Sequence, residues 1–422
     1  GNSQKPDLRQ LFQNYPRNQE LAANLGTSYE VVYPVQLKTS RFRGVSTRKI
    51  SSNNAVEHVS NTSFLIEAHH FKIYLDLELN INLLPPTLTQ FMISATSRQL
   101  IHEDIENCYY HSTVRNRSDS YGAFRTCSGL SGVLYLGDNV FSIHPLDGDH
   151  SSKQPHLLFH HYQLNEDQRR CDVGDGDEKF HCLQERLREI TDYGSDVPPG
   201  KKYIELALIL DQAFFEMHNS PPKEVIGNAI QMINCADLHY HSLNASISLV
   251  HIELWTEDVI HVEPNIEQNL QNIQEYLEQQ YDRRSMDAIH MLSGAAFNDS
   301  VSGAAETDSI CTVKAVGITK VGNIHQTHVT SHVITHMLGH NLGMYHDHDC
   351  CTCPYKSGCH MLNHIQSVQP FHFSSCSIED YFRTLRKGYG VCLFNMPMLR
   401  ESICGNGILE KGEECDCGTS EV

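Results

Sequence analysis

Basic residues and long apolar segments are both scarce in this sequence. Its 422 residues include 32 Lys and Arg against 51 Asp and Glu, which gives a formal net charge of −19. Nucleic-acid-binding proteins carry clustered basic residues, so nucleic acid is excluded as the expected partner. An acidic surface suits calcium and an extracellular location. No stretch is long and apolar enough to span a bilayer, so we expect any membrane anchor outside this fragment.

A leader sequence is also absent. The chain begins at Gly1 without a signal peptide and ends at Val422 inside a cysteine-rich pattern. We therefore expect an internal fragment of a longer secretory-pathway protein. Fifteen cysteines fit an oxidising compartment. Four sequons are compatible with secretion, at Asn61, Asn116, Asn244 and Asn298.

One further absence concerns a single residue. His336 and His340 are four apart, so a helix would place them on one face. Gly343 can end that helix and turn the chain, which brings His346 in as a third imidazole. Three neutral imidazoles suit a tetrahedral zinc ion with one open position. Proteases with this motif carry a glutamate directly after the first histidine as general base. Here Met337 occupies that position, and a thioether can neither take nor give a proton.

Two nearby residues bear on how specific this motif is. His332 and His336 also have helical spacing, but only the pair His336 and His340 is followed by the glycine and the third histidine. We interpret the earlier pair as a coincidence in a histidine-rich stretch. Metzincins place a methionine-containing turn under the zinc site, and Met361 is the candidate. The alternative is that Met361 is an ordinary core methionine.

The pattern of apolar residues divides the chain into three parts. Residues 1–198 contain alternating stretches that predict strands at Glu30–Leu37, Ser63–Leu79 and Val140–Leu146, and a polar linker ends this part at 165–200. The second part alternates strands and helices, which predicts an α/β layered domain with the metal in a cleft. Its predicted strands are 203–210, 246–255, 288–292 and 315–321, and its predicted helices are 221–236, one that starts after Asn265, and 329–342. From Cys404 onward, acidic residues, glycines and cysteines alternate, which suits disulfides and calcium.

These features together resemble the ADAM/reprolysin family of metzincins over nearly the whole chain. The resemblance rests on Cys108-Tyr-Tyr-His, Thr126-Cys-Ser-Gly-Leu, Lys202-Tyr-Ile-Glu-Leu, Cys392-Leu-Phe-Asn and Cys404-Gly-Asn-Gly. It implies a β-rich prodomain with linker at 1–198 and a metallopeptidase-like domain at 199–397. A truncated, disulfide-rich disintegrin start follows at 398–422. The middle domain would be of metzincin type, with a twisted mixed sheet and an active-site helix.

The resemblance is especially close to the membrane-anchored branch whose protease domains are non-catalytic and act in cell adhesion, notably in the nervous system. Ser377-Ile-Glu-Asp-Tyr and Trp255-Thr-Glu are similar to that branch. That branch usually loses its zinc histidines, whereas this chain keeps all three. The chain also lacks a furin-type basic site before Lys202, which suggests that the prodomain is not removed in the usual way.

The resemblance implies two calcium sites. The site in the metallopeptidase-like domain would use Glu205, Asp287, the carbonyl of Cys392 and Asn395. The alternatives are that Glu205 is an exposed charge and that Asp287 is a loop residue. The disintegrin site would use Asn406, Glu410, Glu413 and Asp416.

It also implies specific roles for cysteines. The implied disulfides are Cys311–Cys392, Cys351–Cys376, Cys353–Cys359 and Cys108–Cys127. The remaining Cys171, Cys182, Cys235 and Cys350 admit three pairings. Cys171 is the candidate for a cysteine switch, a prodomain thiolate that caps the zinc, with Cys182 as runner-up. The alternative is a disulfide between Cys171 and Cys182.

Three functions follow from these observations. The first is a pseudoprotease that binds zinc and acts in adhesion or receptor binding, with an extracellular protein or an integrin-like cell-surface receptor as partner. The second is an active zinc endopeptidase, in which zinc-bound water reacts with the help of a non-standard base. The third is a structural ectodomain without metal at the histidines. In each case we expect the protein at the cell surface or outside the cell.

Overall fold

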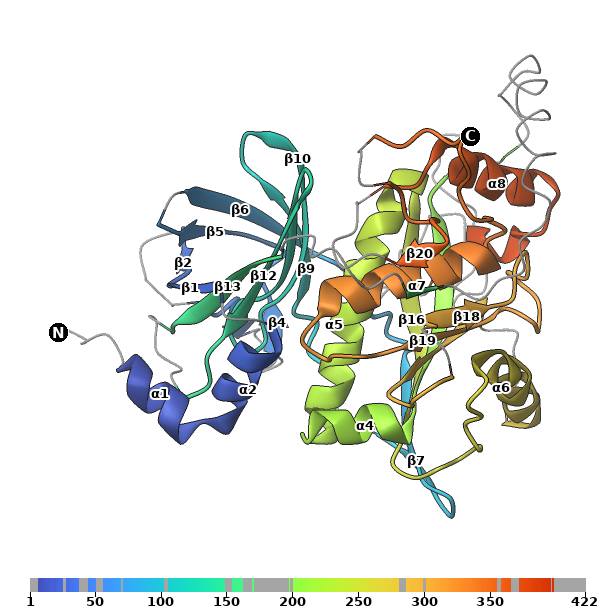
Figure 1. Cartoon of the computed structure of the whole chain (residues 1–422), viewed down its shortest axis with the longest axis horizontal. Helices are drawn as coiled ribbons and strands as arrows, with labels where there is room; N and C mark the ends of the chain where they lie inside the picture. The colour runs from blue at the N-terminus through green and yellow to red at the C-terminus, as the bar shows by residue number, and fades with distance from the viewer. Residues whose placement is uncertain are drawn as a thin grey trace.

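The computed structural model of this chain contains two large β-sheets, the first built from the first half of the chain and the second mainly from the second half (Figure 1). The β-rich first half and the mixed second half confirm the predicted fold class. The described residues are 7–25, 28–37, 45–50, 56–69, 71–101, 105–148, 154–161, 169–170, 197, 200–280, 286–298, 301–354, 358–365, 372–395 and 397. The expected disintegrin start at 398–422 therefore lies wholly outside them.

The first sheet has nine strands, and each neighbouring pair is antiparallel. In spatial order they are β1 (Tyr29–Val32), β13 (His156–His161), β12 (Asn139–Pro145), β11 (Ser131–Leu136), β10 (Arg117–Arg125), β9 (Tyr109–Val114), β6 (Lys72–Leu79), β5 (Asn61–Glu67) and β2 (Val35–Gln36). Side chains along a strand point alternately to the two faces of the sheet, and one face of this sheet forms its core. On β5, Phe64 and Ile66 are buried while their neighbours are not. The predicted strand region 63–79 is thus a hairpin of two strands.

Smaller elements border the first sheet. Two helices precede it, and two short antiparallel strand pairs lie outside both large sheets. The helices are α1 (Leu8–Asn14) and α2 (Pro16–Leu25), and the pairs are β3 (Arg48–Ile50) with β4 (Val56–His58) and β14 (Arg169–Arg170) with β20 (His364–Ile365). The β14–β20 pair joins the first half of the chain to the second.

The second sheet has seven strands and is mostly parallel at its centre. In spatial order they are β18 (Gly303–Ala305), β19 (Val316–Lys320), β17 (Ala288–Ser293), β15 (Lys202–Leu210), β16 (Ala245–Trp255), β7 (Thr89–Ile93) and β8 (Arg98–Leu100). The last two strands come from the first half of the chain. β7 runs parallel to β16, with Thr89 opposite His251 and Ile93 opposite Trp255.

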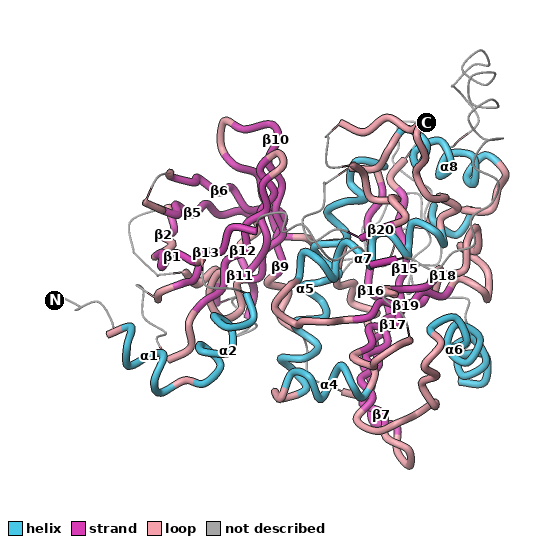
Figure 2. The backbone as a smooth tube through the Cα atoms, in the orientation of Figure 1, coloured by secondary structure: helices cyan, strands magenta, loops and turns pink. Residues whose placement is uncertain are grey.

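Helices cover both faces of this sheet (Figures 1 and 2). On β15, Leu206 and Leu208 face the helices α5 and α7, whereas Ala207 and Ile209 face α6. This arrangement makes β15 a central strand that is buried on both sides. The helices of this half are α4 (Gln212–His218), α5 (Pro222–Tyr240), α6 (Ile266–Gln280), α7 (Thr327–Asn341) and α8 (Ser375–Arg386), with short 3-10 turns η1 (His241–Leu243) and η3 (Val391–Phe394). None of the helices in the described part of the chain combines the length and the apolar character needed to cross a membrane.

Helix α5 lies between the two sheets and is buried along most of its length (Figure 1). Gln231 donates to the carbonyl of Ala123 at 2.9 Å, and Asn234 donates to that of Tyr110 at 3.3 Å. Both acceptors belong to the first sheet. Polar side chains of α5 therefore join the two halves, in addition to apolar packing.

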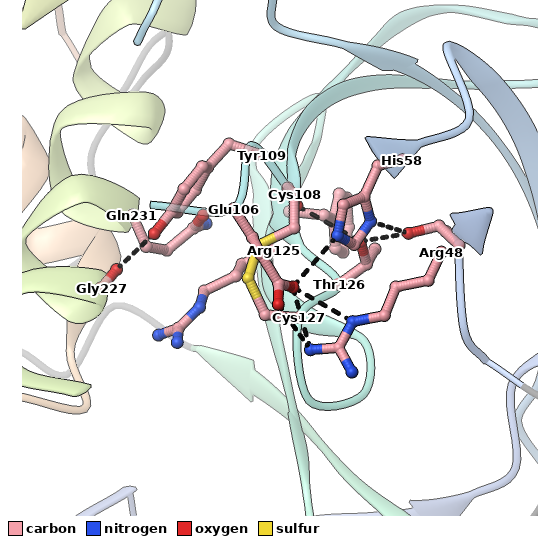
Figure 3. The surroundings of a disulfide bond; sticks show 12 residues. Arg48, His58, Glu106, Cys108, Tyr109, Arg125, Thr126, Cys127, Gly227 and Gln231 are labelled. Atoms are coloured by element: carbon pink, nitrogen blue, oxygen red, sulfur yellow. Dashed lines mark hydrogen bonds and ion pairs between the residues drawn. A yellow bond between two sulfur atoms is a disulfide. The ribbon is translucent and has the colours of Figure 1, made fainter. Parts of the chain in front are cut away.

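The Cys108–Cys127 disulfide lies at this same junction (Figure 3). It links the residue before β9 to the loop after β10. Tyr109, next to the disulfide, donates to the carbonyl of Gly227 on α5 at 3.3 Å. On the other side, Arg48 pairs with Glu106 at 2.9 Å. The disulfide thus holds the strand end that contacts α5.

Acid is expected to destabilise the first sheet through His156. This ring is fully buried, its Nδ1 donates to the carbonyl of Gln154 at 2.9 Å, and its Nε2 accepts from the amide of Leu130 at 3.1 Å. Burial lowers the pKa of His156 to about 4. The folded state therefore binds fewer protons than the unfolded state between pH 6.5 and 4. The stability from this group is present above pH 6.5 and is lost as pH falls toward 4, by about 3 kcal/mol at most.

Urea unfolding at pH 7.5 and at pH 5 measures this loss. The variant His156→Gln keeps a donor and an acceptor without titrating, so it should lose less stability between the two pH values. His261→Gln is the matched control, because the His261 side chain is 80% exposed. Equal pH dependence in the wild type and His156→Gln would contradict the assignment.

Candidate metal centre

Helix α7 and the turn after it bring three predicted histidines together. The Nε2 atoms of His336 and His340 lie 3.0 Å apart, and one ligand atom from each of His336, His340 and His346 lies within 4.8 Å of the others. His336 and His340 are fully buried. The spacing of four residues therefore places the two rings side by side, as the sequence indicates.

Hydrogen bonds fix which nitrogen of each ring faces the cluster. His336 Nδ1 donates to the carbonyl of His360 at 2.7 Å, and His340 Nδ1 donates to that of Met344 at 2.9 Å. A carbonyl can only accept, so in the neutral rings each Nε2 carries a lone pair. Burial, with the neighbouring imidazoles, lowers the pKa of His336 and of His340 well below the ordinary value. Two lone pairs facing each other at 3.0 Å repel, and a cation between them removes the repulsion. This donor set fits zinc.

Two features support the turn that carries His346. Met361 is fully buried under α7, where a side-chain carbon added to Gly339 would lie 2.8 Å from its sulfur. The amide of Asp347 donates to the carbonyl of Met361 at 2.7 Å, and the Asp347 carboxylate accepts from Ser377 at 3.0 Å. The Met361 segment thus contacts both α7 and the turn after it, as a methionine turn would.

Met337 occupies an apolar site beside the histidines. It is fully buried and clusters with Ala305 and Val333. Its methyl carbon lies 2.9 Å from the position that a side-chain carbon on Gly303 would take. The side chain therefore packs against β18 and offers no proton-transfer group.

Gly343 cannot be replaced without strain. Its φ is +87°, and an added side-chain carbon would lie 2.1 Å from Thr384 Oγ1. We expect Gly343→Ala to lower the free energy of unfolding by at least about 1–3 kcal/mol and to weaken zinc binding by displacing His346. Gly388→Ala is the matched control, with φ +79° and no atom within 4 Å. Urea unfolding and zinc content measure the difference, and equal losses in both variants would contradict a role for close packing at Gly343.

Two further histidines adjoin the site and were not predicted as part of it. His332 Nδ1 lies 2.9 Å from His360 Nδ1, and both rings are buried. His360 in turn accepts from His336 through its carbonyl. The one sequence signal for their involvement was the helical spacing of His332 and His336. Such a spacing of two histidines also occurs by chance. Burial of these rings depends on α5 and on the segment before Met361, which sequence spacing does not reveal.

Three residues of the predicted calcium site, Glu205, Asp287 and Asn395, also meet. The amide of Glu205, on β15, donates to Asp287 Oδ2 at 2.9 Å, and Asn395 donates to Glu205 Oε2 at 2.8 Å. Cys392 is tied to this region by its disulfide with Cys311. The amide of Cys311 donates to the carbonyl of Asp287 at 3.3 Å. Burial, with the charge of Glu205 nearby, raises the pKa of Asp287 to about 8. A divalent cation would stabilise both carboxylates in charged form, so these oxygen atoms fit calcium.

The cysteines pair as the family resemblance implies. The structure joins Cys108–Cys127, Cys311–Cys392, Cys351–Cys376 and Cys353–Cys359. Cys350 is also disulfide-bonded, and Cys235 is a buried free thiol. Strand β14 ends one residue before Cys171. Cys171, Cys182 and the predicted ligands Asn406, Glu410, Glu413 and Asp416 lie outside the described residues.

Comparisons with known proteins agree with this geometry. Residues 202–397 match the Reprolysin (M12B) family of zinc metalloproteases, and residues 30–115 match the reprolysin family propeptide. Disintegrin and metalloproteinase domain-containing protein unc-71 of Caenorhabditis elegans is 32% identical over 99% of this chain and 42% of its own length. The human protein 22 of the same series is 31% identical over 86% of this chain and 42% of its own length, and the mouse protein 11 is 32% identical over 86% and 49%. The chain thus spans less than half the length of these relatives.

Proposed function

The chain belongs to the reprolysin (M12B), or ADAM, family, and from this premise we propose that it is an extracellular pseudoprotease whose metallopeptidase-like domain holds zinc without cutting peptides. Its activity would be adhesion or receptor binding, with an extracellular protein or an integrin-like cell-surface receptor as partner. The proposed units are the prodomain with linker at 1–198, the metallopeptidase-like domain at 199–397 and the disintegrin start at 398–422.

The observation that carries the proposal is Met337. When bound, zinc would polarise a substrate carbonyl and lower the pKa of water. The three imidazoles would hold the ion, while His360 and Met344 fix two of them through backbone carbonyls. Peptide hydrolysis also needs a group that takes a proton from water and delivers one to the leaving amine. The thioether of Met337 does neither.

No carboxylate among the described metal-binding atoms of this centre replaces the missing glutamate as general base. The cluster of described metal-binding atoms contains three imidazoles and no carboxylate. The nearest acid in sequence is Asp347, whose Oδ1 accepts hydrogen bonds from Ser374 and Ser377. That carboxylate supports the turn to α8. The alternative of an active endopeptidase would therefore need a base from outside this cluster.

The other proposed properties follow from the same family membership. Calcium would bind between Glu205, Asp287, Asn395 and the carbonyl of Cys392, where it would hold β15 to η3. A location on the cell surface or outside the cell agrees with the disulfides and with the relatives. We propose that any membrane anchor lies outside residues 1–422.

Metal analysis and peptide cleavage test the proposal on the purified chain. We expect His340→Ala to bind one equivalent of zinc fewer than the unmodified chain. We also expect no cleavage of a broad peptide library, with or without added zinc. Cleavage that stops when zinc is chelated would overturn the pseudoprotease. Unchanged zinc content in His340→Ala would leave a structural ectodomain without metal at the histidines.

A further inference from the structure

A second cluster of metal-binding side chains lies at the junction of the two sheets, near the C-terminal end of α5. Its members are His111 of β9, Asp237 of α5 and His241 of η1. The Asp237 carboxylate is fully buried, while the His241 side chain is 42% exposed. One residue therefore comes from the first sheet and two come from the second half of the chain. None belongs to the histidine centre on α7.

The distances in this cluster are close to those of a metal site. Asp237 Oδ2 lies 3.7 Å from His111 Nε2 and 3.5 Å from His241 Nε2. All three ligand atoms lie within 4.8 Å of one another. Zinc binds imidazole and carboxylate at about 2.0–2.2 Å in a tetrahedron, which places neighbouring ligand atoms about 3.3 Å apart. Closure onto zinc would therefore shorten each distance to Asp237 by a few tenths of an ångström and the distance between the two imidazole nitrogens by at most about 1.5 Å.

Surrounding groups already orient the carboxylate. The amide of Ile247 donates to Asp237 Oδ1, and the side-chain amide of Asn80 donates to Oδ2 at 2.8 Å. Asn80 also donates to Asn234 at 3.1 Å, so its position is fixed by α5. Such outer hydrogen bonds hold a metal-binding carboxylate in place. A carboxylate and two imidazoles suit a transition-metal ion such as zinc better than calcium.

The His111 ring would become a ligand by a change of tautomer and a turn from the Asn234 carbonyl toward Asp237. In the metal-free ring, its Nε2 donates a hydrogen bond to the carbonyl oxygen of Asn234 at 2.9 Å. On metal binding, Nε2 would give up that proton to solvent and Nδ1 would take one up, so that the neutral ring offers an Nε2 lone pair. The rings of His111 and His241 meet edge to face, with centroids 4.7 Å apart. The exposed side of His241 leaves a route for the ion from solvent.

We propose that His111, Asp237 and His241 form a second zinc site, which fastens the first sheet to the metallopeptidase-like domain. A metal ion held from both sides links strand β9 to α5 in addition to the hydrogen bonds between them. Separation of the two halves would then require loss of the ion. The proposal does not depend on zinc at His336, His340 and His346.

Zinc titration of the full chain, after removal of metal by a chelator, tests the site. The wild type should bind two equivalents, His241→Ala one, and His340→Ala one, while the double variant should bind none. Loss of a ligand should weaken the second site by at least about 100-fold, since loss of an outer hydrogen bond alone typically weakens a site 10- to 100-fold. Asn80→Ala should fall in that lower range. His261→Ala is the matched control, because it removes an exposed histidine that belongs to none of the described groups of metal-binding side chains.

The His340→Ala background separates the two zinc sites. In that background, added zinc should raise the midpoint of thermal unfolding, and the further change His241→Ala should abolish the rise. Two results would overturn the proposal: His340→Ala binds no zinc, or His241→Ala binds as much zinc as His261→Ala with equal affinity. Either result would mean that the three side chains only form hydrogen bonds between the two halves. If instead His340→Ala retains all the zinc of the wild type, the function proposed for the α7 centre fails while this site stands.

Discussion

The variant Met337→Glu is expected to cleave short peptides that the unmodified chain leaves intact. General bases contribute roughly 10²–10⁴-fold to rates, so we expect a gain of at least about 100-fold over the unmodified chain. The new carboxylate would have nearly the length of the methionine and would start from the same position on α7, next to His336 and His340. Activity should require zinc and should disappear with a chelator.

The other parts of the histidine site are already in place for the Met337→Glu variant. Two imidazoles are held by backbone carbonyls, and Met361 supports the helix from below. The carboxylate would enter an apolar space beside Ala305 and Val333, so its burial should lower the stability of the metal-free protein by about 1–3 kcal/mol. Zinc should recover part of that loss, because the cation lies beside the new charge.

Met337→Gln provides the matched control. It has the same length and a polar end, but its amide does not accept a proton from water at neutral pH. It should remain inactive, and rates of hydrolysis of a fluorogenic peptide series compare the variants directly. Equal activity of the glutamate and glutamine variants, or zinc-dependent activity of the unmodified chain at the same level, would contradict the role assigned to Met337.

Loss of the Cys311–Cys392 disulfide is expected to have the largest effect on stability. The two cysteines are separated by 81 residues, and closure of such a loop is worth about 4.5 kcal/mol in the chain-entropy description. A typical domain has a total stability of about 5–15 kcal/mol. The pair of changes Cys311→Ser and Cys392→Ser should therefore remove a large part of it. It should also weaken calcium binding, since this disulfide holds η3 near Glu205 and Asp287.

The Cys353–Cys359 disulfide is the control for loop length. Its cysteines are six residues apart, so its loss should cost about 2 kcal/mol on the same scale. Urea unfolding under non-reducing conditions, with and without calcium, measures both variants. A loss from Cys353→Ser with Cys359→Ser that equals or exceeds the loss from the long loop would contradict the entropic account.

Local patterns predicted the elements of the second half well. The helix after Asn265 is present as α6, and the Asn265 side chain accepts from the amide of Glu267 at 3.0 Å as an N-cap does. The apolar run that begins at Tyr203 is the buried strand β15. Spacing also predicted that His336, His340 and His346 meet, because their separation is set within one helix and one turn.

Features that depend on distant contacts were not predictable in the same way. The helices α1 and α2 are short and mostly polar, so their periodicity is weak. His332 and His360 are buried by packing, which no local signal encodes. The cluster of His111, Asp237 and His241 joins segments more than a hundred residues apart. A lone histidine in a strand carries no sign of such a partner.

Strands β7 and β8 make the two halves mutually dependent. Cleavage in the segment between β13 and β15 would cut the chain and still leave this hairpin inserted beside β16. Its departure would remove the β7 partner from residues 251–255 of β16 and expose an edge that could pair with a strand of another molecule. A nicked molecule is therefore expected to persist as a non-covalent pair, and a molecule that does lose its hairpin becomes a candidate for strand exchange with another copy.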